Sequence, residues 1–392
     1  KQIPSIFGQL LYGSKFHRLR MSRGQQGIGI SAAGMYGLLT TGQPVRITSR
    51  TSPRADAHFY ELQIDTKMNR PDIIRDDVVE WSVPHGTRVA IELEAKYQKG
   101  KQSVDDYLQQ TAIANPHVTI NYRSPDGRTD HYIASVNQLP ATPKTIRPHP
   151  HGIELGVLLK MVGDAKGKTA QQFLCNEFSR VSPRVAQEIL TKAQVRPSAR
   201  ATSLGGDNVK AIYEAIQATA IMAPATDCVV PIGEEQLIAG LDQVVGAEFY
   251  AAKTRRPAVY RGNPFVIEVA IAYGKSSAPA PATLLADPDA EPTDGDDDDD
   301  PTDMPQARVI RFANRVPLQY QPGACAITKS ITQLNWKSYG LSQSRGSLPT
   351  GPLTITVHIA SVWVPFTSES KEAIASYPEI IKELKLGLQE CG

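Results

Sequence analysis

The chain has 392 residues, 41% of them hydrophobic and 21% charged, a balance typical of a globular protein with two to three domains. It has no run of about 18 apolar residues and no apolar signal-peptide core, so we expect a cytoplasmic protein without a membrane span. Ten acidic residues lie between positions 287 and 303, and without them the formal net charge would rise from +2 to +12. A basic body of this kind suits a polyanionic partner.

The first part of the chain alternates strand and helix patterns. We expect a helix over residues 31–39, strands over 45–51, 59–64 and 89–95, a helix over 104–114, and a hairpin formed by 118–122 and 131–136. The hairpin would close at Ser124-Pro125-Asp126-Gly127, which is a turn sequence. We interpret residues 1–150 as one domain, a sheet with helices on one face.

A proline-rich stretch, residues 139–151, reads as a linker. His149 and His151 in it suggest a metal site, but no third ligand is suitably spaced, so we favour the linker. Helix-length segments follow, with expected N-caps at Thr169, Ser182 and Asp207: 153–162, 169–178, 182–192 and 208–220. Basic residues accompany these helices, and either DNA contact or a solvated face would explain them: Lys160, Lys166, Lys168, Arg180, Arg184, Lys192, Arg196 and Arg200.

Residues 223–392 read as a further domain after the helical segment 151–222. We expect a helix over 235–251, strands over 265–273, 308–314 and 353–363, and a long helix over 370–389 that Pro378 either kinks or restarts. Residues 276–305 are rich in Pro, Ala and Asp, so we expect a disordered acidic insertion. The four cysteines (175, 228, 325 and 391) form no Cys-x-x-Cys pair, and we interpret them as buried free thiols rather than a zinc site or disulfides.

A glycine-rich stretch, residues 22–31, precedes the first expected helix. Gly24, Gly27 and Gly29 would let backbone N–H groups approach a phosphate at a helix N-terminus, although a plain tight turn is the alternative. The stretch is neither a dinucleotide fingerprint nor a Walker loop, because it lacks the acidic residue of the first and the terminal Gly-Lys-Ser/Thr of the second.

Longer motifs elsewhere in the chain indicate what the glycine-rich stretch does. Residues 10–17 (LLYGSKFH), 36–42 (YGLLTTG), 111–117 (TAIANPH), 311–318 (RFANRVPL) and 335–341 (NWKSYGL) resemble the B subunits of type IIB DNA topoisomerases, in the GHKL ATPase superfamily. The resemblance covers nearly the whole chain. It implies an α/β (α+β) fold with a GHKL (Bergerat) ATPase sandwich, a helix–two-turn–helix insert over 151–222, and a transducer domain over 223–392. The transducer would carry a βαβ crossover and a long C-terminal helix.

The resemblance also implies ATP and Mg²⁺ as cofactors. The residues it assigns to the nucleotide are Ser14, Lys15, Gly24, Gln25, Gln26, Gly27, Ile28, Gly29, Ile30, Ser31, Thr87 and Lys337. Lys337, in Trp-Lys-x-Tyr, would contact the γ-phosphate as a switch, with a surface lysine as the alternative. The family also uses an upstream Glu, Asn and Asp-x-Gly-x-Gly turn that are not found before residue 22. We therefore expect a first domain without its front part, and a chain that by itself binds ATP poorly and hydrolyses it negligibly.

The partners implied by the resemblance are double-stranded DNA, a second B subunit upon ATP binding, and a tyrosine-bearing A subunit in an A2B2 heterotetramer. We expect a nucleoid-associated protein that relaxes and decatenates DNA as part of this complex, and no DNA-cleaving residue in this chain. Two alternatives stay open: another GHKL ATPase of the chaperone or mismatch-repair type, and a non-catalytic DNA-binding or scaffold fragment.

Overall fold

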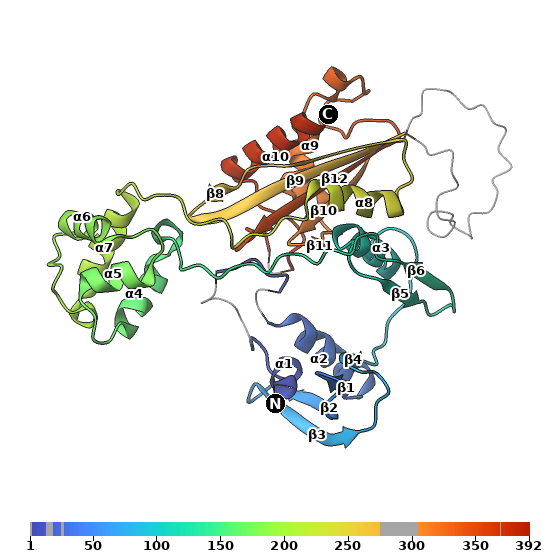
Figure 1. Cartoon of the computed structure of the whole chain (residues 1–392), viewed down its shortest axis with the longest axis horizontal. Helices are drawn as coiled ribbons and strands as arrows, with labels where there is room; N and C mark the ends of the chain where they lie inside the picture. The colour runs from blue at the N-terminus through green and yellow to red at the C-terminus, as the bar shows by residue number, and fades with distance from the viewer. Residues whose placement is uncertain (1, 13–18, 25–26, 275–304, 369) are drawn as a thin grey trace. The chain divides into compact units, whose positions relative to one another are not determined.

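The computed structural model describes every residue except 1, 13–18, 25–26, 275–304 and 369 (Figure 1). The chain divides into two compact units: unit 1 comprises Lys1–His17 and Gly24–Tyr97, and unit 2 comprises Arg18–Arg23 and Gln98–Gly392. Residues 98–150, which we grouped with the first expected domain, belong to unit 2. The expected disordered insertion lies outside the described residues, apart from its last residue.

Unit 1 is built on a four-stranded antiparallel sheet in the order β3-β2-β1-β4. Its elements are α1 (Ile3–Gly8), α2 (Gly29–Thr41), β1 (Val45–Arg50), β2 (Ala57–Asp65), β3 (Arg70–Val79) and β4 (Gly86–Ala90). Buried and exposed residues alternate along β1 and β2, and the buried set, including Ile47 and Leu62, packs against Ile3 and Phe7 of α1. Helix α2 approaches the sheet at Gly34, where a Cβ would lie 2.6 Å from Val45. These contacts agree with the expected sheet covered by helices.

Two strand predictions in unit 1 need correction. The strand expected over 89–95 is β4, which ends at Ala90, because its partner β1 begins at Val45 and offers no ladder beyond that point. We did not predict β3, because its residues are mostly exposed and its apolar and charged residues do not alternate.

The helical module of unit 2 contains four helices, as predicted: α4 (Leu155–Asp164), α5 (Ala170–Glu177), α6 (Pro183–Lys192) and α7 (Gly206–Gln217). Short 3₁₀ turns, η1 (Pro150–Gly152) and η2 (Ala201–Ser203), accompany them. Thr169 forms a capping box with Gln172, and Ser182 caps α6, so both of these cap predictions are confirmed. The third cap is wrong: α7 begins after Gly205, which offers no side chain, and Asp207 lies inside the first turn.

The rest of unit 2 is organised around a sheet in the order β11-β10-β12-β9-β7, with β8 also paired to β9. The helices and strands are α3 (Val104–Ala114), β5 (Ile120–Arg123), β6 (Thr129–Tyr132), α8 (Glu234–Val244), β7 (Phe249–Thr254), β8 (Ala258–Tyr260), β9 (Asn263–Tyr273), β10 (Arg308–Ala313), β11 (Val316–Pro317), α9 (Ala326–Gln333), β12 (Leu353–Ser361) and α10 (Pro378–Cys391). Two further 3₁₀ turns are η3 (Pro322–Ala324) and η4 (Trp336–Tyr339). Strands β10 and β12 are parallel, and the other pairs are antiparallel.

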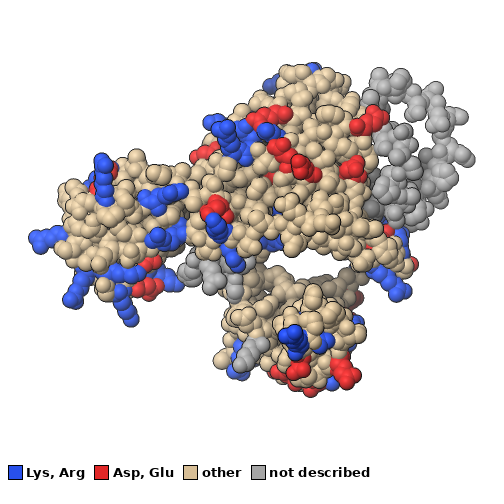
Figure 2. Space-filling model, in the orientation of Figure 1, with Lys and Arg blue, Asp and Glu red and all other residues tan. Residues whose placement is uncertain are grey.

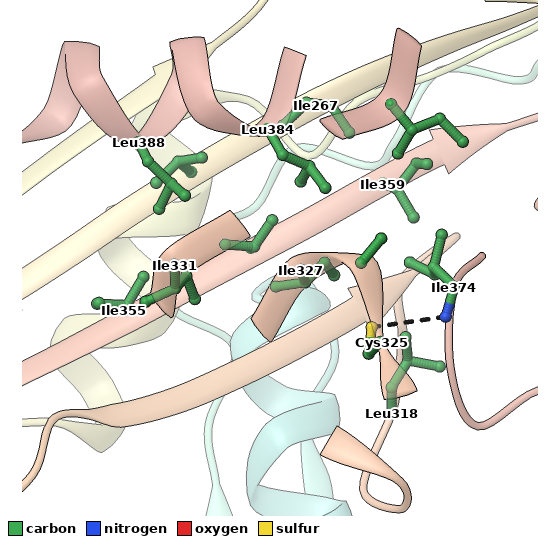
Figure 3. Close-up of a cluster of buried hydrophobic side chains, with 14 of the residues drawn as sticks. Ile267, Leu318, Cys325, Ile327, Ile331, Ile355, Ile359, Ile374, Leu384 and Leu388 are labelled. Carbon is green, nitrogen blue, oxygen red and sulfur yellow. Dashed lines mark hydrogen bonds between the residues drawn. The ribbon is translucent and has the colours of Figure 1, made fainter. Parts of the chain in front are cut away.

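Helices cover both faces of this sheet, which explains why every residue of β12 is buried. On one face α9 and α10 pack, with Leu384 and Leu388 of α10 directed toward the strands (Figure 3). On the other face, residues of α3 and α8 form a cluster with Phe312 and other sheet residues. The β5–β6 hairpin closes around residues 124–128, as expected.

Two long helix predictions in unit 2 are wrong in extent. The helix expected over 235–251 ends at Val244, because residues 249–254 instead pair with β9 as strand β7. The helix expected over 370–389 begins only at Pro378, which occupies its first turn, where a missing N–H costs nothing. Pro378 therefore starts this helix rather than kinking it.

Cys228, Cys325 and Cys391 are buried free thiols, as expected, whereas Cys175 is only half-buried. Among the described residues, we find no helix whose length and apolar character would let it cross a membrane.

Candidate functional site

The glycine-rich stretch continues into the N-terminus of α2, which begins two residues earlier than expected, at Gly29. Its N-cap residue, Ile28, makes no side-chain hydrogen bond to the first turn. The first N–H groups of a helix have no partner within the helix, and they carry the positive end of its dipole. Gly29 and Ile30 are exposed here, so this terminus has the character of an anion-binding site.

Gly27 gives the stretch its turn. Its φ is +73°, its carbonyl accepts a hydrogen bond from the N–H of Leu11 at 3.1 Å, and a Cβ on it would lie 2.4 Å from the Tyr12 carbonyl oxygen. Around Gly24 and Gly29, by contrast, a Cβ would meet nothing within 4 Å. The stretch thus has one glycine required by its own conformation and two that leave open space in front of the backbone.

We expect Gly27→Ala to destabilise unit 1 by about 2 kcal/mol or more, because the positive φ and the clash with the Tyr12 carbonyl add together. Gly24→Ala is the matched control, since its Cβ enters open space, and its melting temperature should equal that of the parent. Thermal unfolding of both variants measures this difference. Equal melting temperatures for the two variants would contradict the assigned turn.

The hydroxyl groups of two residues of the predicted site, Ser31 and Thr87, lie within hydrogen-bonding distance of other groups of the protein. The Ser31 hydroxyl donates to the carbonyl oxygens of Ile6 and Gln9 at 3.2 and 3.3 Å, so only the backbone of Ser31 is available to a ligand. The exposed Thr87 lies on β4, with its hydroxyl 3.0 Å from that of Ser49. Ser14, Lys15, Gln25 and Gln26 lie outside the described residues.

Lys337 lies in unit 2, on the exposed side of η4. Its neighbour Trp336 is buried and anchors this turn, because the indole N–H donates to the Ile331 carbonyl at 2.8 Å. Together with residues 340–344 and Thr350, Lys337 lines a shallow depression of about 430 Å³. Lys337 is exposed, so its side chain can reach a ligand in the solvent.

A buried carboxylate lies within the sheet of unit 2. Glu268 accepts hydrogen bonds from the N–H groups of Ile232 and Gly233, both at 2.7 Å, from Nδ1 of His358 at 2.7 Å, and from the Thr254 hydroxyl at 3.0 Å. Burial by itself raises the pKa of Glu268, but these hydrogen bonds outweigh it and hold the pKa below its ordinary value.

The two-residue turn between β10 and β11 is linked to Glu268 through His358. Asn314 and Arg315 both adopt positive φ, 49° and 66°, as expected for a tight hairpin turn. The Arg315 N–H donates to Nε2 of His358 at 3.0 Å, and its guanidinium donates to the carbonyls of Ala114 and Pro231 at 3.2 and 2.9 Å. Burial lowers the pKa of Arg315 to about 10, so it stays charged at neutral pH and balances Glu268.

Sequence reasoning missed this buried network, although it quoted the motif that holds Asn314 and Arg315. A usable signal was present, because Glu268 and His358 carry ionisable side chains in the middle of two largely apolar strands. A buried charge or imidazole in such a strand needs partners, and that requirement points to a network.

The helical module carries exposed basic side chains, which project from it in Figure 2. Lys168 and Lys192 form ion pairs with Glu177 and Glu188. His149 and His151, the pair first considered as metal ligands, instead hydrogen-bond to backbone carbonyls at residues 216–222 through Nε2. We find no cluster of three or more His, Cys, Asp or Glu suited to a metal ion within the described part of the chain.

Comparisons with known proteins identify relatives along the whole chain. Residues 224–392 match a family described as "Topoisomerase VI B subunit, transducer". The B subunit of type 2 DNA topoisomerase 6 from Methanococcoides burtonii is 45% identical over 391 residues, which cover 100% of this chain and 59% of that relative. The protein of the same name from Natronomonas pharaonis is 30% identical, with 100% of this chain and 69% of the relative covered.

This chain therefore spans about three fifths of the length of the first of these relatives. Among solved structures, the B subunit of DNA gyrase from Myxococcus xanthus superposes with a TM-score of 0.33 at 10% identity, covering 97% of this chain and 74% of that one.

Proposed function

The chain belongs to the family of type 2 DNA topoisomerase 6 B subunits, and from this premise we propose that it is the ATP-binding and ATP-hydrolysing subunit of a type IIB DNA topoisomerase. The observation that carries the proposal is the open glycine stretch at a helix N-terminus without a side-chain cap. It lies in a chain whose own whole length matches B subunits of type 2 DNA topoisomerase 6. Membership in this family removes the chaperone and mismatch-repair alternatives.

The nucleotide would be held mainly by backbone groups. The N–H groups of residues 27–31 would bind the phosphates, with Gly24 and Gly29 allowing close approach, and Thr87 on β4 and the residues 14–15 and 25–26 would complete the site. Bound ATP with Mg²⁺ would supply a γ-phosphate that ADP lacks. The exposed ammonium of Lys337 is suited to contact that phosphate, and a contact made only with ATP stabilises one conformational state.

The assembly follows from the same premise. ATP binding would dimerise two B subunits around a captured duplex, and α10 would transmit this closure to an A subunit that cuts DNA in an A2B2 complex. Helix α10 is suited to transmit movement, because Arg255 next to strand β7 forms ion pairs with both Glu383 and Glu390 along it.

Titration of the full-length protein with AMP-PNP and Mg²⁺ tests the proposal, with calorimetry for binding and light scattering for mass. We expect micromolar binding accompanied by a doubling of the mass. Duplex binding that depends on salt but not on nucleotide, without dimerisation, would instead indicate a DNA-binding scaffold.

We expect the helical module to contact DNA phosphates through its exposed cations. Replacing Arg196 and Arg200 with Gln should weaken duplex binding and make the slope of log K against log salt shallower by about 0.9 for each phosphate that is no longer neutralised. Replacing Arg256 and Lys382, also exposed but outside the module, changes the charge equally and serves as the control. Fluorescence anisotropy across a salt series measures both slopes, and equal slopes would show that the module is only a solvated face.

A further inference from the structure

A short segment of the chain leaves unit 1, is incorporated into unit 2, and then returns to unit 1. Residues 18–23 belong to unit 2, although residues 1–17 and 24–97 on either side of them belong to unit 1. The residue after this segment is Gly24, the first glycine of the proposed nucleotide site. The contacts that hold residues 19–23 in unit 2 therefore also fix the position of the chain just before Gly24.

Backbone hydrogen bonds and an apolar contact fix the first part of the segment. The Leu19 carbonyl accepts from the N–H of Ile146 at 3.0 Å, and the Met21 N–H donates to the Cys228 carbonyl at 2.8 Å. The Met21 side chain is 8% exposed and packs in a cluster that includes Val266 of β9 and Ala360 of β12. The segment is thus attached to the sheet of unit 2.

The last part of the segment is held by two side-chain amides. Asn314 Nδ2 donates to the Ser22 carbonyl at 3.0 Å and to the Ser361 carbonyl at 3.0 Å, and its Oδ1 accepts from the Ser361 N–H at 2.8 Å. The Arg23 guanidinium donates to Oδ1 of Asn115, which follows helix α3. A single buried amide therefore joins the residue two positions before Gly24 to the end of β12.

The turn that presents Asn314 is itself rigidly supported. Asn is the residue that most readily adopts positive φ apart from glycine, whereas Arg at the second position is strained there. That strain is offset by the hydrogen bonds of Arg315 to His358, Ala114 and Pro231. The β10–β11 turn is consequently held in place by several hydrogen bonds. A movement of residues 19–23 would therefore be passed through it to the sheet.

We propose that Asn314 is a positioning residue that couples the glycine stretch to the transducer sheet through the Ser22 carbonyl. The inference rests on the proposed function, since it takes residues 24–31 as the nucleotide site. ATP bound at that stretch pulls on the chain at Ser22, and the pull is transmitted to the β10–β11 turn and the end of β12. This route is separate from the one through Lys337, because it uses the covalent chain and needs no contact with the γ-phosphate.

Hydrogen exchange followed by mass spectrometry on the full-length protein, with and without AMP-PNP and Mg²⁺, tests this coupling. We expect AMP-PNP to slow exchange in peptides covering the glycine stretch and also in peptides covering residues 313–316 and 357–362. Protection of the glycine stretch alone would overturn the inference and leave the proposed function intact. If neither region is protected, both the inference and the proposed nucleotide site are wrong.

Asn314→Gly separates coupling from stability. Glycine accepts the positive φ without strain, so the variant loses the bonds to Ser22 and Ser361 but keeps the turn. We expect it to keep nucleotide protection of the glycine stretch, to lose that of residues 357–362, and to show a kcat for ATP hydrolysis lower by about threefold to tenfold, with KM nearly unchanged.

Arg315→Gly is the matched control, because it also removes a side chain from the same turn but leaves every Asn314 bond in place. It should lower the melting temperature and still show protection in both regions. Loss of distal protection in Arg315→Gly to the same extent as in Asn314→Gly would overturn the specific role of Asn314. Should either variant fail to fold, the measurement on the parent protein still decides the inference.

Discussion

Lys337→Ala should abolish most ATP-driven DNA relaxation while leaving most of the nucleotide affinity. The ammonium is exposed at the edge of a shallow depression, and the buried Trp336 fixes the turn that carries it, so the substitution removes a charge without disturbing the core. Loss of one preorganised donor to a charged phosphate costs about 100-fold in rate. Relaxation of supercoiled plasmid by the complex with an A subunit, together with AMP-PNP titration, measures both parts.

Arg345→Ala is the matched control, since it removes an exposed cation that follows Ser344 in the sequence but does not line the depression. The control should relax plasmid at the parent rate. If Lys337→Ala relaxed plasmid as fast as the control does, Lys337 would be an ordinary surface lysine and the switch proposal would fail. If it lost nucleotide affinity and relaxation to the same degree, its role would be ground-state binding rather than switching.

Local patterns were sufficient where the structure depends on neighbours in the sequence. The helix expected over 104–114 is α3, with the same first and last residues, because Ser103 caps it and Asp105 and Asp106 favour its N-terminus. The capping box at Thr169 is another local signal, and it was read correctly. In each case the residues that decide the structure lie within one helical turn of one another.

Patterns failed where distant pairing decides the structure. Residues 249–251 were expected to end a helix but instead begin β7, since β9 offers them a ladder. Residues 91–95 alternate like a strand, but the register of β4 with β1 ends at Ala90. No local property of either segment contains this information, because strand pairing depends on residues far away in the chain.

One part of the candidate site could likewise be predicted from local sequence, and another part could not. The glycine stretch could be recognised in the sequence, because three glycines within six residues precede a helix. The Asn314 network could not be read from the sequence, because it joins Ser22, Asn314 and Ser361, which are separated by 292 and 47 residues. Only the folded sheet brings these residues together.

Glu268→Gln should be the most destabilising conservative substitution in unit 2, at about 2–4 kcal/mol. Each carboxylate oxygen accepts two hydrogen bonds: one from Ile232 and His358, the other from Gly233 and Thr254. A glutamine amide must place its NH2 group against two of these donors in either orientation. It also removes the negative charge that favours the charged form of Arg315 and so raises its pKa. Calorimetry should show a melting transition lowered by about 5–10 °C.

Glu235→Gln, an exposed residue in the first turn of α8, is the control and should change stability by about 0.5 kcal/mol or less. The pH dependence supplies a second comparison. Because the pKa of Glu268 is lower in the folded state than in the unfolded state, its contribution is complete above the unfolded pKa and is lost as the pH falls through the folded pKa. The stability of the parent should therefore decline more steeply on acidification than that of Glu268→Gln. Parallel pH profiles for the two proteins would mean that Glu268 is not charged in the fold, and that the network is held by neutral hydrogen bonds alone.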